Sequence, residues 1–222
     1  MVGRFQDKVV IVTGSSNGIG RATALLFAEE GAKVTITGRS DEALQATKKG
    51  MQSVGAKDAD ILAIVGDLID ESIQKKIVED TVSRFGGIDI LVNNAGGTAP
   101  SNTVEQGFEQ TMEAYDYVMN LNTRVVLTLT KLALPHLIAS KGEVVMVSSI
   151  AALPLAFEAA MASDQNMVPA GRVGVAREVA EAIAFLADRR ISSFIVGHSL
   201  VIDGGSSIMC PLFAPRAAEG FE

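Results

Sequence analysis

Short runs of β-branched and other apolar residues alternate along this chain with longer segments of mixed hydrophobic and polar residues. Five runs carry few polar residues: Lys8–Thr13, Lys33–Thr37, Ile61–Val65, Ile88–Val92 and Glu143–Val147. Apolar strands that do not alternate with polar positions are typical of a parallel sheet covered on both faces. We therefore predict parallel strands at these positions.

Each of the first four runs is followed by a segment whose apolar residues recur every three or four positions. These segments are Gly18–Glu30, Asp41–Val54, Asp70–Phe85 and Glu109–Ile138. Pro135 predicts a bend near the end of the last one. Regular alternation of strand and helix is typical of doubly wound sheets. The pattern predicts the α/β class, with a Rossmann-like doubly wound parallel sheet in a single domain.

The regular alternation of strand and helix ends after the fifth run. Residues 151–170 contain two prolines and at most one short helix, Phe157–Met167, whereas Ala176–Ala187 has the spacing of an amphipathic helix. His198–Ile202 reads as a further strand. A parallel crossover needs only about a dozen residues, so this strand can return beside Glu143–Val147 and give a six-stranded sheet. The alternative leaves a gap in the sheet beside the fifth strand.

We expect residues 1–209 to form one domain and residues 210–222 to be a loosely held tail. The 222 residues are 48% hydrophobic and 20% charged, which excludes a disordered chain. A net charge of −7 makes a nucleic-acid partner or a basic membrane-surface role unfavourable. No apolar run is long enough to span a membrane, and the first eight residues do not resemble a signal peptide.

The cysteine and histidine residues bear on the cellular compartment of the protein and on metal binding. Cys210 is the single cysteine, so no disulfide can form within the chain, which fits a reducing compartment. We therefore expect a cytoplasmic protein. His136 and His198 have no second ligand at metal-binding spacing, so no metal site is predicted.

The segment between the first strand and the first helix, TGSSNGIG, is the strongest chemical signal. Its glycines allow a sharp turn and a close approach of the backbone to a pyrophosphate, and the following helix presents its positive end there. The expected cofactor-binding residues of this loop are Gly14, Ser16, Asn17, Gly18, Ile19 and Gly20. The alternative interpretation is a tight turn that binds nothing.

The residues after the second strand bear on the choice of cofactor. An acidic residue there would accept hydrogen bonds from the ribose hydroxyls of NAD. This chain has Gly38 followed by Arg39, and a guanidinium suits the 2′-phosphate of NADP. We therefore predict NADP (NADPH) in preference to NAD, against the alternative that Arg39 is a solvated side chain.

Two further groups follow the third and fourth strands, where the carboxyl ends of parallel strands form a ligand crevice. Asp67 and Leu68 lie where a side chain can reach an adenine, although Asp67 can equally cap the next helix. The second group is Asn94, Ala95 and Gly96, in a turn of small residues beside the expected cofactor path.

Taken together, TGSSNGIG, NNAGG, Asn122 in NLNTR, VMVSS, GRVGVAREVAEAIAFLAD and VIDGG resemble the short-chain dehydrogenase/reductase family over residues 4–153 and 168–207. The resemblance implies an NADP(H)-dependent oxidoreductase that interconverts a small-molecule carbonyl and alcohol by hydride transfer. It implies that Asn122 holds a water in a proton relay and that Ser149 orients the substrate carbonyl. The alternatives are a polar contact between helices for Asn122 and a strand-end turn for Ser149.

The family's acid/base pair, Tyr-x-x-x-Lys, has no counterpart here. The chain has no tyrosine after Tyr117 and no lysine after Lys141, and residues 161–166 stand where the pair is expected. We infer that a segment is deleted near residues 154–167, so that the fold is truncated around the sixth strand. Family members are usually homo-oligomers, but the helix that forms their subunit interface falls in this segment. Tyr115 and Tyr117 are expected to be core or interface aromatics.

Three interpretations remain open at this point. The chain is an active oxidoreductase, a catalytically inactive NADP(H)-binding pseudoenzyme, or a truncated isoform or gene-model product without function. A methyltransferase is disfavoured because the glycine loop is accompanied by Asn94, Asn122 and Ser149 in dehydrogenase order.

Overall fold

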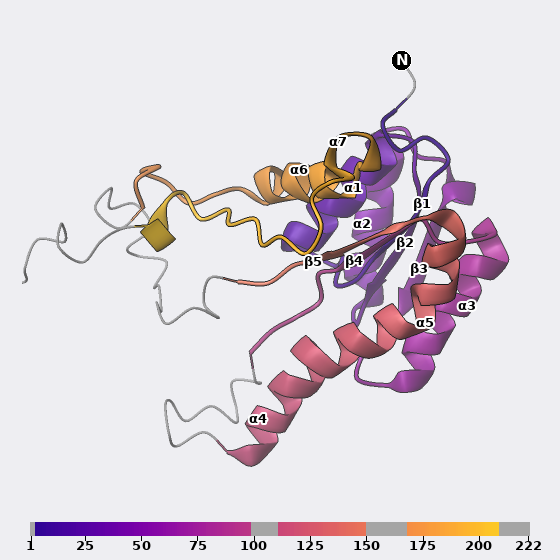
Figure 1. The fold of residues 1–222 in the computed structure, drawn as a ribbon. Helices are drawn as coiled ribbons and strands as arrows, with labels where there is room; N and C mark the ends of the chain where they lie inside the picture. The colour runs from indigo at the N-terminus through magenta and orange to yellow at the C-terminus, as the bar shows by residue number, and fades with distance from the viewer. Residues whose placement is uncertain (1–2, 99–110, 150–167, 209–222) are drawn as a thin grey trace, which may run out of the picture.

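A parallel sheet forms the centre of the molecule in the computed structural model, which describes residues 3–98, 111–149 and 168–208. Its strands are β1 (Val9–Val12), β2 (Lys33–Gly38), β3 (Ile61–Val65), β4 (Ile90–Asn93) and β5 (Glu143–Met146). They are ordered β3-β2-β1-β4-β5 (Figure 1). The chain builds the sheet outward from β1 to β3, and then crosses back to place β4 and β5 on the other side of β1. This confirms the doubly wound α/β fold and puts a topological switch point beside β1.

Helices cover both faces of this sheet. One face carries α1 (Gly18–Glu29), α2 (Asp41–Ser53) and α6 (Ala176–Ala187), and the other carries α3 (Glu71–Phe85) and α5 (Val125–Ser140) (Figure 1). The shorter helical segments are Asp58–Asp60, α7 (Arg189–Ser192) and Ser206–Ile208.

The packing of the central strand, β1, explains why its sequence does not alternate between apolar and polar residues. Val10 and Val12 pack into the core beneath α1, α2 and α6, whereas Ile11 packs into the core beneath α3 and α5. All three side chains are fully buried. Successive side chains point to opposite faces of a strand, so a sheet covered on both sides needs apolar residues at every position.

One long helix connects β4 to β5. It consists of α4 (Met112–Met119), a π-helical turn (Asn120–Arg124) and α5. The predicted helix is confirmed over its described residues. Its departure from α-helical hydrogen bonding lies at the π turn, and Pro135 lies within α5.

The predicted sixth strand is wrong. No strand forms among the described residues after β5, and Leu200, Val201 and Ile202 are 42%, 50% and 47% exposed. α6 buries Ala180, Ile183 and Ala184 mainly against α1 and also contacts β5. The apolar segment after α6 nevertheless stays exposed, and a short apolar run that has nothing packed on it does not form a strand.

Other expectations fall outside the described residues. These are the short helix 157–167, the deletion junction 154–167, residues 161–166, Cys210 and the tail 210–222. Within the described ranges, no helix combines the length and apolarity that a membrane span requires.

Candidate functional site

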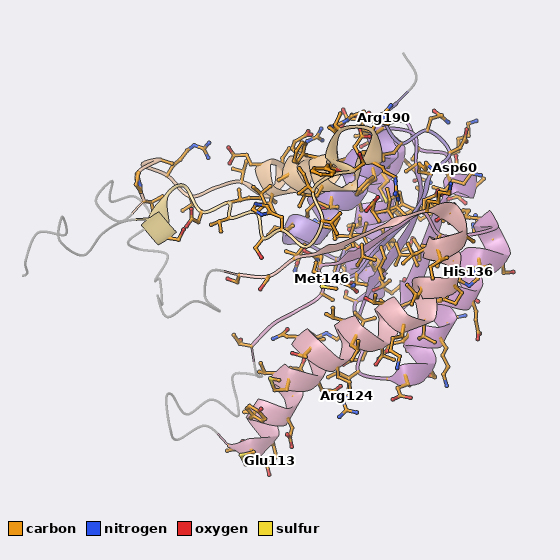
Figure 2. The ribbon with its side chains drawn as sticks, in the orientation of Figure 1. Asp60, Glu113, Arg124, His136, Met146 and Arg190 are labelled. Carbon is orange, nitrogen blue, oxygen red and sulfur yellow. The ribbon has the colours of Figure 1, made fainter. Side chains whose placement is uncertain are left out.

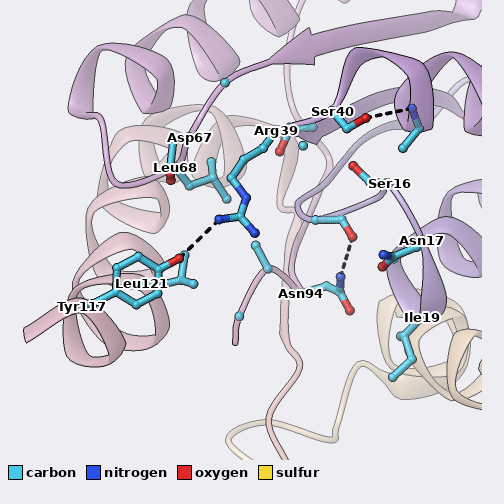
Figure 3. Close-up of a pocket in the computed structure, with 18 residues that line it drawn as sticks. Ser16, Asn17, Ile19, Arg39, Ser40, Asp67, Leu68, Asn94, Tyr117 and Leu121 are labelled. Atoms are coloured by element: carbon cyan, nitrogen blue, oxygen red, sulfur yellow. Dashed lines mark hydrogen bonds between the residues drawn. The ribbon is translucent and has the colours of Figure 1, made fainter. Parts of the chain in front are cut away.

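A cavity of about 450 Å³ opens at the carboxyl end of the sheet, next to the switch point (Figure 3). It contains all but Gly18 of the predicted cofactor residues: Gly14, Ser16, Asn17, Ile19, Gly20, Arg39, Asp67, Leu68, Asn94, Ala95 and Gly96. Its remaining lining residues are Thr37, Gly38, Ser40, Ala43, Gly66, Tyr117 and Leu121. The structure therefore brings together residues that the sequence places in four separate loops.

The loop after β1 has a backbone that larger residues could not adopt. Gly14 has φ +64°, and a Cβ there would stand 2.9 Å from the Cα of Ala95. A Cβ at Gly20 would overlap the carbonyl oxygen of Gly14. The glycines thus let three backbone segments meet at the floor of the cavity.

The amino end of α1 fits an anionic group such as a pyrophosphate. Its N-cap, Asn17, makes no side-chain hydrogen bond to the helix, and the first turn contains no acidic residue. Asn17, Ile19 and Gly20 line the cavity. The amides and the positive dipole end of α1 are therefore available to an anion bound there.

Hydrogen bonds fix this loop in place. The buried Ser15 hydroxyl donates to the carbonyl of Val12 at 2.7 Å and accepts from the amide of Thr37 at 3.0 Å. Thr47 donates to the carbonyl of Ser15 at 2.8 Å, and Arg21 donates to the carbonyl of Ser16. Hydrogen bonds from α1, β2 and α2 thus hold this loop in place.

Asn94 joins the loop after β4 to the loop after β1. Its Nδ2 donates to the carbonyls of Thr13 at 2.9 Å and Gly14 at 3.2 Å. The Thr13 hydroxyl accepts from the amides of Asn94 and Ala95, both at 2.9 Å. These bonds connect two neighbouring strand ends and close one side of the cavity.

Asn122 lies in the π turn and holds the loop after β4 from the other side. Its Oδ1 accepts from the amide of Gly97, and its Nδ2 donates to the carbonyl of Gly97, both at 2.9 Å. The contact is thus between a helix and a loop, not between two helices. Ser149 is exposed and lies three residues beyond β5, and neither residue lines the cavity.

The structure tests the helix-cap interpretation of Asp67. The N-cap of α3 is Asp70, whose carboxylate accepts from the amide of Ser72 at 2.8 Å. The Ser72 side chain and then this amide bond lower the pKa of Asp70. Asp67 instead accepts from the amide of Ile69 at 3.1 Å and lines the cavity. The helix-cap interpretation of Asp67 is wrong.

Tyr117 lines the cavity, which the sequence did not predict. It is half-buried, and its Oη accepts a hydrogen bond from Nη1 of Arg39 at 3.4 Å (Figure 3). Tyr115 is 53% exposed, which excludes the core position expected for it and leaves the interface position as a prediction. The spacing of Tyr117 and Leu121, one helical turn apart, was the available signal, but it does not say which element that face meets.

Comparisons with known proteins agree with this geometry. A family model described as short chain dehydrogenase matches residues 8–162, and one described as Enoyl-(Acyl carrier protein) reductase matches residues 151–207. A solved short-chain dehydrogenase/reductase of unknown function from Caenorhabditis elegans, determined with cofactor, superposes with a TM-score of 0.90 at 36% identity, covering 94% of this chain and 98% of that one.

Two curated relatives show how the chains align. L-fucose dehydrogenase of Rattus norvegicus is 40% identical over 153 residues, which are 67% of this chain but only about half, 52%, of that protein. A 3-oxoacyl-[acyl-carrier-protein] reductase of Thermotoga maritima is 30% identical over 250 residues, covering 91% of this chain and 98% of the reductase. The chain therefore belongs to the short-chain dehydrogenase/reductase family of oxidoreductases, which use a nicotinamide cofactor.

Proposed function

We propose that this chain binds NADP(H) in the cavity at the carboxyl end of its sheet. The observation that carries the proposal is the combination, in one cavity, of the Gly14–Gly20 loop at the amino end of α1 with Arg39 at the end of β2. In this arrangement the α1 amides would hold the pyrophosphate and Arg39 would hold the 2′-phosphate. Asp67 and Leu68 would serve the adenine, and the Asn94–Gly96 turn would serve the nicotinamide side.

The preference for NADP(H) rests on charge. The cavity has Gly38 where a carboxylate would bind the ribose hydroxyls of NAD, and the next residue is a cation. A guanidinium presents two parallel N–H donors to a phosphate. A solved relative described as an NADH-dependent reductase complexed with NAD, 29% identical with a TM-score of 0.76, shows that the fold alone does not fix this choice.

Titration of the purified 222-residue protein with NADPH and NADH tests the proposal. We expect tighter binding of NADPH, and an Arg39→Ala variant that loses about tenfold or more in NADPH affinity with little change for NADH. Lys131→Ala is the matched control, because Lys131 is exposed on α5 and does not line the cavity. Equal affinities for the two cofactors would contradict the preference, and saturation by neither would overturn the binding site.

We further propose the family reaction, transfer of hydride between the nicotinamide and a small carbonyl or alcohol, with Ser149 and Asn122 as the residues of this chain that serve it. When bound, the cofactor supplies the hydride. Reduction also needs a proton for the developing alkoxide, which an acid of matched pKa normally donates. This chain has no tyrosine after Tyr117 and no lysine after Lys141 to fill that role.

A second candidate function, cofactor binding without turnover, follows from the absence of this tyrosine and lysine. The 250-residue alignment with the Thermotoga reductase includes 91% of the 222 residues here, about 202, so about 48 aligned positions lack a residue of this chain. The two family models also meet within residues 151–162. Both observations support a segment missing near residues 154–167.

Turnover assays separate the two candidates. The protein is given NADPH with a panel of small ketones and aldehydes, and oxidation of NADPH is followed. Activity above that of a Ser149→Ala/Asn122→Ala variant supports the oxidoreductase. Saturable NADPH binding without such activity supports the binding protein.

A further inference from the structure

We propose that Tyr117 is a binding residue for the adenosine half of the cofactor, and that its hydroxyl strengthens the preference for a 2′-phosphate by holding the Arg39 guanidinium at the cavity. The inference rests on the proposed function and adds a residue to it. Tyr117 comes from α4, whereas Arg39 follows β2, 78 positions earlier in the chain. The two side chains meet across the cavity (Figure 3).

The first argument concerns charge. Within the described ranges Arg39 makes no ion pair, and its side-chain hydrogen bond goes to the neutral phenol of Tyr117. A carboxylate at that position would neutralise the guanidinium, whereas a phenol orients it and leaves its full charge for an incoming phosphate. The guanidinium has five N–H donors, so it can keep the phenol while two donors bind the phosphate.

The second argument concerns order. Arg39 is exposed, and a free arginine side chain loses considerable rotamer freedom when it is fixed on a ligand. A contact that already holds the guanidinium beside the cavity lowers that entropic cost. The bond, at 3.4 Å, is long, so its contribution is modest, which sets the small size of the effect expected when the hydroxyl is removed.

The third argument concerns the ring. Tyr117 is the one aromatic residue among the described residues that line the cavity, and Leu121 lies one turn later on the same wall. The buried Leu68 belongs to the β3 side of the same cavity. An aromatic face with apolar neighbours is the surface on which a flat purine base stacks. The ring and the hydroxyl therefore have separate roles, which substitutions can separate.

Two variants test these roles against NADPH and NADH. Tyr117→Phe removes the hydroxyl, so we expect the Kd for NADPH to rise about threefold while that for NADH stays unchanged. Tyr117→Leu also removes the ring, so we expect both Kd values to rise by about tenfold. Tyr115→Phe and Tyr115→Leu are the matched controls, because Tyr115 is exposed on the same helix and does not line the cavity.

A double-mutant cycle distinguishes this role from a structural one. In an Arg39→Ala background, Tyr117→Phe should no longer change NADPH affinity, because the phenol then has no guanidinium to hold. Additive effects would overturn the role of the hydroxyl, and an unchanged affinity of Tyr117→Leu for both cofactors would overturn the role of the ring. Either result leaves the proposed function intact if the wild-type protein binds NADPH, whereas no NADPH binding by the wild type overturns both.

Discussion

Single residues determine the shape of the cofactor cavity. Gly14 combines a positive φ with a close approach to Ala95, so its conformation and its surroundings both exclude a side chain. The amide group of Asn94 joins the loops after β1 and β4, and that of Asn122 joins the π turn to the loop after β4. The floor of the cavity is thus made largely of backbone that these side-chain hydrogen bonds hold in place.

Gly14→Ala tests this description directly. We expect loss of NADPH binding and a decrease of about 1–3 kcal/mol in the free energy of unfolding, since alanine is strained at φ +64°. Urea denaturation and cofactor titration measure the two effects. Gly87→Ala is the control, because Gly87 has open space around it and no positive φ. A Gly14→Ala protein that binds NADPH like the wild type would contradict the assigned role of the loop.

Residue identity predicted part of the site. All but Gly18 of the cofactor residues that the sequence indicated line one cavity, because glycine and small polar residues at strand ends have few other uses. The interpretation of Asp67 remained open, since two aspartates three positions apart both suit a helix cap and only the backbone selects Asp70. Tyr117 was missed because helical spacing does not reveal which element a helix faces.

At the scale of elements, burial explains which strands could be predicted. β1, β2 and β4 are almost wholly buried, as the unbroken apolar runs of β1 and β4 predict. Residues 198–202 have a similar composition, yet no helix covers them and no strand forms. Strand formation there depends on what packs nearby, which a short apolar run does not record.

Glu178, at the start of α6, takes part in an ion pair whose contribution to stability depends on pH. The Glu178 carboxylate accepts from Arg172 at 2.6 and 2.9 Å and from the amide of Val175 at 2.8 Å. The hydrogen bonds from Arg172, and then that from Val175, lower the pKa of Glu178 from 4.5 to about 2. The ionised form is thus favoured in the folded protein.

The lowered pKa of Glu178 predicts the pH range in which its hydrogen bonds stabilise the folded protein. Its contribution to stability is complete above the unfolded-state pKa of 4.5 and is lost as the pH falls from there toward about 2. Thermal unfolding should therefore show Glu178→Gln below the wild type in Tm near neutral pH, with the gap closing in acid. Glu79→Gln, at an exposed position on α3, is the control. A Tm difference that is unchanged at pH 2 would refute the assignment.

At the scale of the whole molecule, the edge of the sheet at β5 exposes apolar side chains. β5 is the last strand in the described sheet, and Met146 near its end is 61% exposed (Figure 2). Phe194 and Val196 are also 100% and 86% exposed. Exposed apolar surface of this kind can accept further structure, which is consistent with the proposed missing segment.

The adenosine side of the cavity lies far from that edge, in strands and loops that the structure describes completely. Its binding can therefore be tested independently of the missing acid/base pair. The central claim, an adenosine site that recognises a 2′-phosphate, needs no nicotinamide and no turnover.

The most direct measurement is calorimetric titration of the protein with adenosine 2′,5′-bisphosphate and with adenosine 5′-monophosphate. The two ligands differ only in the 2′-phosphate. We predict that the bisphosphate binds about tenfold or more tightly, and that Arg39→Ala removes this difference. Equal affinities, or no saturable binding of either ligand, would contradict the account.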